Sequence, residues 1–286
     1  MYPDIPYPTS DAISVQLDMT GAMADVIPYL EFCAVQSRRV REAIDHLADV
    51  RVGSRDEERL DAFPARQPRS PIVVFVHGGW WMSNTRKHRS YLAHPLLAHG
   101  FAAVISDYAL CPKVRIPDIS AATRAAVAWA FEHAAEINGD PDRIFVVGHS
   151  AGGQQAGMMA VTDWRACGLP SDVVKGAVPM SGIFDMRVIR RSYLQPYVQL
   201  TGETELSESP LFHIPETAPP VRAMVGGEES VEFHRQARLF VAAYSAKGHR
   251  ADYVPVAGED HATYLASMGD PDSQTCQLVV DFLRSC

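Results

Sequence analysis

A strand, a tight turn and a helix rich in small residues follow one another around Ser150, and this arrangement constrains the fold most. The strand ends at Val147, and the turn reads Gly-His-Ser-Ala-Gly, which is the G-x-S-x-G pattern. Gly148 and Gly152 leave space for a sharp turn because neither has a Cβ atom. Ser150 is therefore predicted to be a nucleophile lifted clear of a sheet. The alternative is a serine that merely caps the helix.

Composition places the chain among ordinary globular proteins and excludes several classes of partner. Of its 286 residues, 47% are hydrophobic and 21% are charged, and the formal net charge is −8. No block rich in Lys and Arg is present, so we expect neither a nucleic-acid nor a membrane partner. No apolar run is long enough to cross a bilayer.

Cysteine usage and the first residues suggest a compartment. The five cysteines are scattered, odd in number and without a C-x-x-C motif, which indicates free thiols in a reducing environment. The start Met-Tyr-Pro-Asp-Ile-Pro has no basic or apolar stretch, so no signal peptide is expected. These features together predict a cytoplasmic protein.

Strands and helices alternate along most of the chain. Fully apolar strands that alternate with helices predict an α/β fold with a mostly parallel sheet covered on both faces. We expect one domain over residues 1–286, opened by a helical segment over about 1–47 (a helix from Ala22 to Leu47). Expected strands are 49–53 and 59–63 (a hairpin), 72–76, 102–106, one before Gly148, 174–180, 221–225 and 251–256; expected helices are 87–99, 118–137, one after Ser150, 231–246 and 274–283.

The stretch from about residue 183 to 220 breaks this alternation. It holds Tyr193, Tyr197 and several prolines but no clear strand, so it is predicted to be a cap inserted between two late strands. An irregular surface connection is the alternative interpretation. Tyr193 and Tyr197 are then candidates for lining the substrate pocket.

A serine hydroxyl needs a base, and the base needs an acid that orients it. In a fold of this kind the chain order is serine, acid, histidine. Among eleven histidines, His261 stands alone in a loop after the last strand, where the base is expected. The acid should follow the strand 221–225, in the sequence Gly-Gly-Glu-Glu, where Glu229 is the first choice and Glu228 the second.

The sequence His77-Gly-Gly-Trp-Trp directly follows the strand 72–76. Its glycines allow backbone N–H groups of Gly78 and Gly79 to converge with that of Ala151 on one oxyanion. Trp80 and Trp81 are candidates for the substrate pocket, with burial in the core as the alternative. No H-E-x-x-H motif, zinc-type Cys/His cluster or nucleotide-binding G-x-G-x-x-G is present, so neither a metal nor a cofactor is expected.

From about Arg69 onward the chain resembles the α/β-hydrolase fold. The segments HGGWW, Asp107-Tyr-Ala-Leu-Cys-Pro, DPDRIFVVGHSAGG and GGEESVEFHRQ are similar to the arylformamidase (kynurenine formamidase) and hormone-sensitive-lipase-like esterase branch. The resemblance implies a triad of Ser150, Glu229 and His261, with Gly78, Gly79 and Ala151 as the oxyanion hole. That family usually has aspartate at the acid position.

Three functions follow as hypotheses. The first is a serine hydrolase that removes a formyl or small acyl group from an aryl amide or ester, with N-formylkynurenine as the best substrate guess. The second is a carboxylesterase of broad specificity for short-chain or aromatic esters. The third is a small-molecule receptor of the same fold without catalysis. The expected partner is a small-molecule substrate, and the sequence leaves the oligomeric state open, a homodimer included.

Overall fold

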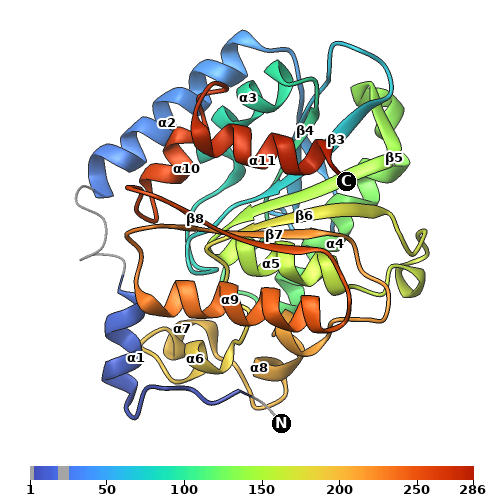
Figure 1. Ribbon diagram of the computed structural model, residues 1–286. Helices are drawn as coiled ribbons and strands as arrows, with labels where there is room; N and C mark the ends of the chain where they lie inside the picture. The colour runs from blue at the N-terminus through green and yellow to red at the C-terminus, as the bar shows by residue number, and fades with distance from the viewer. Residues whose placement is uncertain (1–2, 19–25) are drawn as a thin grey trace.

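The computed structural model describes residues 3–18 and 26–286, which are built around one eight-stranded sheet (Figure 1). Its strand order is β1-β2-β4-β3-β5-β6-β7-β8. Strands β3 to β8 are parallel, and the hairpin β1–β2 joins the sheet antiparallel to β4. The strands are β1 Leu47–Arg51, β2 Arg59–Phe63, β3 Ser70–Val76, β4 Ala102–Ser106, β5 Gly139–His149, β6 Val174–Met180, β7 Val221–Gly226 and β8 Ala251–Val256. The sheet is mostly parallel, as predicted for the α/β-hydrolase fold.

The central strands are apolar throughout because both faces of the sheet are buried. In β3, Ile72, Val74 and Val76 point into one hydrophobic cluster, and Val73 and Phe75 point into a second cluster. Successive side chains of a strand point to opposite faces, so a strand covered on both sides has no position for a polar side chain.

Helices form a layer on each face of this sheet (Figure 1). Helices α2, α3, α10 and α11 supply the smaller cluster, while α4, α5 and α9 supply the larger one. Their bounds are α2 Val26–Ala43, α3 Ala93–Ala98, α4 Ile116–Glu132, α5 Ala151–Val161, α9 Val231–Ala246, α10 Thr263–Ser267 and α11 Gln274–Arg284.

The segment 183–220 contains short helices instead of strands. Together with α1 (Ser10–Leu17) these helices gather on the outer side of α9 (Figure 1). They are α6 Arg187–Arg190, α7 Gln195–Val198, α8 Thr204–Ser207 and the 3₁₀ turn η5 Pro210–Phe212.

The helix expected over 118–137 begins earlier, at Ile116, and α4 ends at Glu132, where a 3₁₀ turn over Ala134–Ile137 follows. Two other predicted helices differ more from the structure. The first was expected from Ala22 to Leu47, but α2 ends at Ala43 and Leu47 already begins β1; residues 22–25 lie outside the described residues. The reason is the pairing of Leu47 with Ala62 of β2, which extends the hairpin toward the helix.

The second was expected as one helix over 87–99 and is broken into three short pieces. Pro95 lacks an N–H group and is tolerated only in the first turn of a helix, so the α-helix proper begins at Ala93. The preceding residues form two 3₁₀ turns, η1 Arg86–His88 and η2 Ser90–Leu92.

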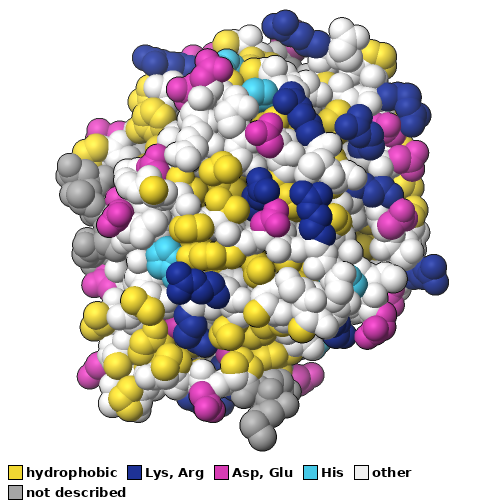
Figure 2. All heavy atoms as spheres, in the orientation of Figure 1, with side chains coloured by type: hydrophobic (Ala, Val, Ile, Leu, Met, Phe, Trp, Pro, Cys, Tyr) yellow, Lys and Arg dark blue, Asp and Glu magenta, His cyan; other side chains and the backbone are white. Residues whose placement is uncertain are grey.

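The surface carries charges of both signs. On the face seen in Figure 2, basic and acidic side chains are interspersed, and apolar side chains lie between them. In the described part of the chain, no helix combines the length and the hydropathy that a bilayer span requires.

Candidate active site

Ser150 lies in a strained turn between β5 and α5. Its φ and ψ angles are 58° and −118°, a conformation that non-glycine residues rarely adopt. The backbone N–H of Ser150 donates to the oxygen of Met180 at 2.8 Å, which ties the turn to β6. A Cβ atom on Gly152 would lie 2.0 Å from the backbone oxygen of Val76, so only glycine fits there. The turn therefore depends on close packing of α5 against β3.

Glu229 and His261 meet next to this turn. Glu229 follows β7, His261 follows β8, and the two strands are neighbours in the sheet. Nδ1 of His261 lies 2.6 Å from Oε2 of Glu229, and both side chains are buried. An ionised carboxylate only accepts hydrogen bonds, so Nδ1 carries the hydrogen and Nε2 is left free to accept a proton.

The other carboxylate oxygen of Glu229 has two donors of its own. The backbone N–H of Gly226 donates to Oε1 at 2.7 Å, and the hydroxyl of Ser181 makes a short hydrogen bond to the same atom. Glu228, the second choice for the acid, is exposed, and its N–H donates to the backbone oxygen of Glu259. The structure thus brings Glu229 and not Glu228 to His261.

His149, which precedes the serine, supports the loop of His261. Its Nε2 atom lies 2.9 Å from the backbone oxygen of His261, and the two rings are 4.5 Å apart. Burial lowers the pKa of His149 well below its ordinary value, and the neighbouring His261 and Arg89 lower it further. A neutral His149 therefore links the serine turn to the histidine loop.

The glycine loop after β3 packs directly on the serine turn. A Cβ atom on Gly78 would lie 2.7 Å from the Cβ atom of Ser150, so the backbone of this loop approaches the serine closely. Ala151 is the first residue of α5, and the first four N–H groups of a helix have no partner within the helix. Gly78 and Ala151 thus lie beside Ser150, and the oxyanion hole of Gly78, Gly79 and Ala151 stays a prediction.

Buried charges hold this loop in place. Nε2 of His77 lies 3.0 Å from Oδ1 of Asp107, and the His77 ring stacks on Tyr108 with centroids 4.2 Å apart. The guanidinium of Arg86 donates to Asp107 at 2.9 Å and to Asp61 at 3.0 Å. This network anchors the residue before Gly78 to β4 and β2.

Aromatic rings continue from His261 toward the glycine loop. The Phe233 ring lies 5.0 Å from the His261 ring, and the Trp80 ring lies 6.2 Å from the Phe233 ring. Trp80 is half-buried. Phe233 is fully buried, so of these two rings only Trp80 offers a face that a flat group of a substrate can contact.

The neighbouring Trp81 does not share this position. Its side chain is fully buried, and its Nε1–H donates to Oε1 of Gln154 in α5 at 3.2 Å. The prediction that Trp81 lines the substrate pocket is therefore wrong, because the indole belongs to the core and ties the loop to the helix after Ser150.

The two candidate tyrosines of the segment 183–220 lie on the outside of the molecule. The hydroxyl of Tyr193 donates to the backbone oxygen of Leu17, and its N–H donates to Ser14. Tyr193 and Tyr197 are 43% and 52% exposed. Tyr193 therefore packs on α1, and neither tyrosine is seen to contact the residues around Ser150 in the described parts of the chain.

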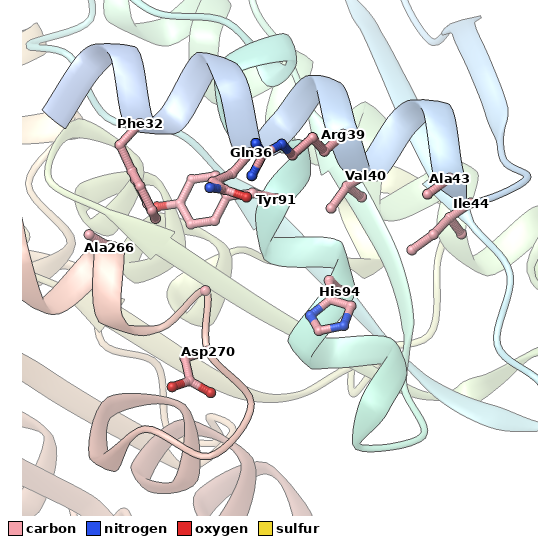
Figure 3. Close-up of a pocket in the computed structure, with 11 residues that line it drawn as sticks. Phe32, Gln36, Arg39, Val40, Ala43, Ile44, Tyr91, His94, Ala266 and Asp270 are labelled. Atoms are coloured by element: carbon pink, nitrogen blue, oxygen red, sulfur yellow. The ribbon is translucent and has the colours of Figure 1, made fainter. Parts of the chain in front are cut away.

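A separate groove lies between α2, α3 and α10 (Figure 3). It has a volume of about 480 Å³, and Phe32, Tyr91 and His94 are among the side chains that line it. None of its lining residues belongs to the predicted site.

Comparison with known proteins decides the family. The sequence profile of the BD-FAE family matches residues 61–244, which is more than half of the chain and includes Ser150 and Glu229. The chain belongs to the BD-FAE family.

Relatives of this BD-FAE protein are hydrolases. A kynurenine formamidase from Danio rerio is 26% identical over 86% of this chain and 85% of its own length. Esterase LipQ from Mycobacterium tuberculosis is 26% identical over 73% of this chain and 53% of its own length. The crystal structure of a protein described as a putative thioesterase, from Silicibacter sp. TM1040, matches with a TM-score of 0.79. It is 27% identical and covers 92% of this chain and 95% of that chain. This BD-FAE protein is thus a serine hydrolase of the α/β-hydrolase fold, on the arylformamidase and esterase branch.

Several residues of the BD-FAE site escaped sequence reasoning. His149 contacts the histidine loop, and nothing in the local sequence links the two. For Ser181 the usable signal is its place directly after an apolar strand, while the sequence gives no such signal for Phe233. Arg86 gave no signal, because its partners come from two other strands.

Proposed function

We propose that this hydrolase removes a formyl or small acyl group from an aryl amide, with Ser150 as the nucleophile, His261 as the general base and Glu229 as the acid. The observation that carries the proposal is the 2.6 Å contact between His261 and Glu229 beside the strained turn of Ser150. Buried Glu229 fixes the imidazole with its Nδ1–H turned away from the serine.

The reaction begins when the Oγ atom of Ser150 attacks the carbonyl carbon of the substrate and its proton passes to Nε2 of His261. The negative charge that forms on the carbonyl oxygen is held by the N–H groups of Gly78, Gly79 and Ala151. The tetrahedral intermediate then collapses. The bond to the leaving nitrogen breaks, and His261 returns the proton to the amine.

A water molecule completes the cycle. His261 takes a proton from the water, which attacks the acyl ester on Ser150, and the carboxylic acid leaves as the Oγ atom regains its proton. For a formyl group the product is formate. Throughout, the carboxylate of Glu229 stabilises the imidazolium that forms on His261.

An aryl leaving group is supported by the rings beside the imidazole. Trp80 is half-buried and offers an apolar face that a flat ring can stack on, and it packs on the buried Phe233 ring, which lies 5.0 Å from His261. The similarity to kynurenine formamidase from Danio rerio supports N-formylkynurenine as the substrate. The similarity to esterase LipQ supports the second candidate, a carboxylesterase.

The substrate is a small molecule, and we place the protein in the cytoplasm. The five cysteines, none of them in a disulfide, support a reducing compartment. The formal net charge of −8, and the basic and acidic side chains interspersed on the face seen in Figure 2, speak against a nucleic-acid or anionic-membrane partner.

The test compares kcat/KM for N-formylkynurenine with kcat/KM for 4-nitrophenyl acetate. We expect the formamide to be the better substrate and Ser150→Ala to abolish turnover of both. A clear preference for the ester would favour the carboxylesterase. Full activity of the Ser150→Ala variant would overturn the assigned nucleophile.

A further inference from the structure

Segments that follow three neighbouring strands meet at the carboxylate of Glu229, on the side of its Oε1 atom. Ser181 follows β6, Glu229 follows β7, and Tyr264 lies in α10 after β8. Ser181 and Tyr264 are fully buried, and Glu229 is 8% exposed. The Ser181 hydroxyl makes short hydrogen bonds both to Oε1 of Glu229 and to the hydroxyl of Tyr264.

The direction of these hydrogen bonds follows from the number of hydrogens available. The carboxylate of Glu229 can only accept, so Ser181 must donate its single hydroxyl hydrogen to it. The Ser181 oxygen then has only lone pairs to offer, and the Tyr264 hydroxyl must donate to it. Burial and the charge of Glu229 raise the pKa of Tyr264 well above its ordinary value, so that phenol keeps its hydrogen.

The backbone of Ser181 is held in an unusual conformation. Its φ angle is 47°, in the left-handed region, and its N–H donates to the backbone oxygen of Met224 at 2.8 Å. Such a conformation is disfavoured for a residue with a side chain and persists only where the surroundings enforce it. Here it brings the hydroxyl to Glu229.

We propose that Ser181 and Tyr264 are positioning residues that form a relay, Tyr264 to Ser181 to Glu229, which holds the glutamate in register with His261. The inference rests on the proposed function. Each carboxylate oxygen has a separate task, since Oε1 is held by Ser181 and Gly226 and Oε2 faces His261.

The first test removes the Ser181 hydroxyl without straining the backbone. Glycine suits a φ of 47°, so Ser181→Gly deletes the hydroxyl at a conformation that glycine accepts. We expect kcat to fall by about 10- to 100-fold, the effect of losing one hydrogen bond to a charged group, while KM stays the same. An unchanged kcat would overturn the proposal.

Tyr264→Phe provides a second variant, which keeps the buried ring. Only the far end of the relay is lost, so the expected fall in kcat is smaller, about 3- to 10-fold. Because the two hydroxyls act in series, the double variant should lose no more than Ser181→Gly alone. A full multiplication of the two losses would contradict the series arrangement.

A double-mutant cycle separates positioning from a general structural role. In Glu229→Gln the carboxylate is already gone, so adding Ser181→Gly should lower kcat by less than about 2-fold. The same loss in both backgrounds would show that Ser181 acts independently of Glu229.

A matched control is available elsewhere in the fold. Ser120 donates to the buried Glu208 at 2.6 Å, a serine-to-carboxyl hydrogen bond that involves neither Glu229 nor His261. We expect Ser120→Ala to keep the wild-type kcat.

Proton NMR gives a readout that does not depend on turnover. The hydrogen between His261 and Glu229 should give a low-field resonance that shifts in Ser181→Gly and stays in Ser120→Ala. If the wild type turns over neither substrate but the resonance shifts as stated, the proposed function fails and the relay stands. If the wild type is active and neither kcat nor the resonance responds to Ser181→Gly, the relay fails alone.

Discussion

The imidazole of His149 donates from Nε2 to the backbone oxygen of His261 across 2.9 Å, with the two rings 4.5 Å apart. The residue next to the nucleophile thus holds the main chain of the base. A backbone oxygen only accepts, so Nε2 of His149 must carry a hydrogen. The serine turn and the histidine loop are therefore joined by a direct hydrogen bond.

The buried His149 makes stability depend on pH. Burial lowers its pKa well below the ordinary value, so below about pH 6.5 the unfolded chain binds a proton that the folded protein does not. The free energy of unfolding contributed by this group is fully present above that pH. It decreases as the pH falls further, by up to about 1.4 kcal/mol per pH unit.

Urea unfolding at pH 7.5 and at pH 5.5 measures this effect in the wild type and in His149→Asn. We expect a smaller loss of stability on acidification in the variant, because asparagine does not titrate. His88, whose pKa is also lowered by burial, is present in both proteins and cancels in the comparison. Equal losses in the two proteins would show that His149 does not titrate differently on folding.

The two neighbouring glutamates should differ sharply in their effect on catalysis. Glu229→Gln removes the charge that stabilises the His261 imidazolium, so kcat should fall by about 10³- to 10⁴-fold. Glu228 is exposed, and Glu228→Gln should keep the wild-type kcat. Steady-state kinetics of both variants decides the matter, and comparable losses would mean that the acid is misassigned.

Replacing Arg86 should lower the free energy of unfolding far more than replacing an arginine of a surface ion pair. It donates to Asp61 and Asp107, which are both buried, so Arg86→Met leaves two carboxylates without their main cation. The expected destabilisation is about 3–5 kcal/mol. Arg51 pairs with Asp56 at the surface, with side chains 45% and 84% exposed, so Arg51→Met should cost less than about 1 kcal/mol. Chemical denaturation compares the two, and similar costs would contradict this account of the Arg86 network.

Because the backbone of Ser150 is strained, replacing it with glycine should relieve the strain while it abolishes activity. Glycine tolerates a positive φ, so Ser150→Gly should be more stable than Ser150→Ala by about 1 kcal/mol, while both are inactive. Thermal unfolding of the two variants checks this. A less stable glycine variant would mean that the turn is not strained.

Sequence patterns predicted the sheet well where strands are buried on both faces. Strands β4 and β6 have the expected bounds, Ala102–Ser106 and Val174–Met180, because a continuous apolar run has one stable place in such a sheet. The helix expected over 87–99 does not form as one piece because Pro95 is tolerated only in the first turn of a helix. The segment before it is also held by the hydrogen bond of Arg86 to the buried Asp61.

Part of the site was predictable because buried strands can be located from the sequence. Ser150, Glu229 and His261 follow the ends of their strands, and a strand end can be located from sequence. Ser181 and His149 could not be paired with their partners in this way. Their contacts depend on which strands are neighbours in the sheet and on side-chain direction, and neither is contained in a local pattern.

Mass spectrometry after labelling with a fluorophosphonate tests the central assignment most directly. The wild-type protein should carry one adduct, located on Ser150 by peptide sequencing, and labelling should be lost in both Ser150→Ala and His261→Ala. An adduct on another serine, or equal labelling of the His261→Ala variant, would contradict the assigned nucleophile and its base.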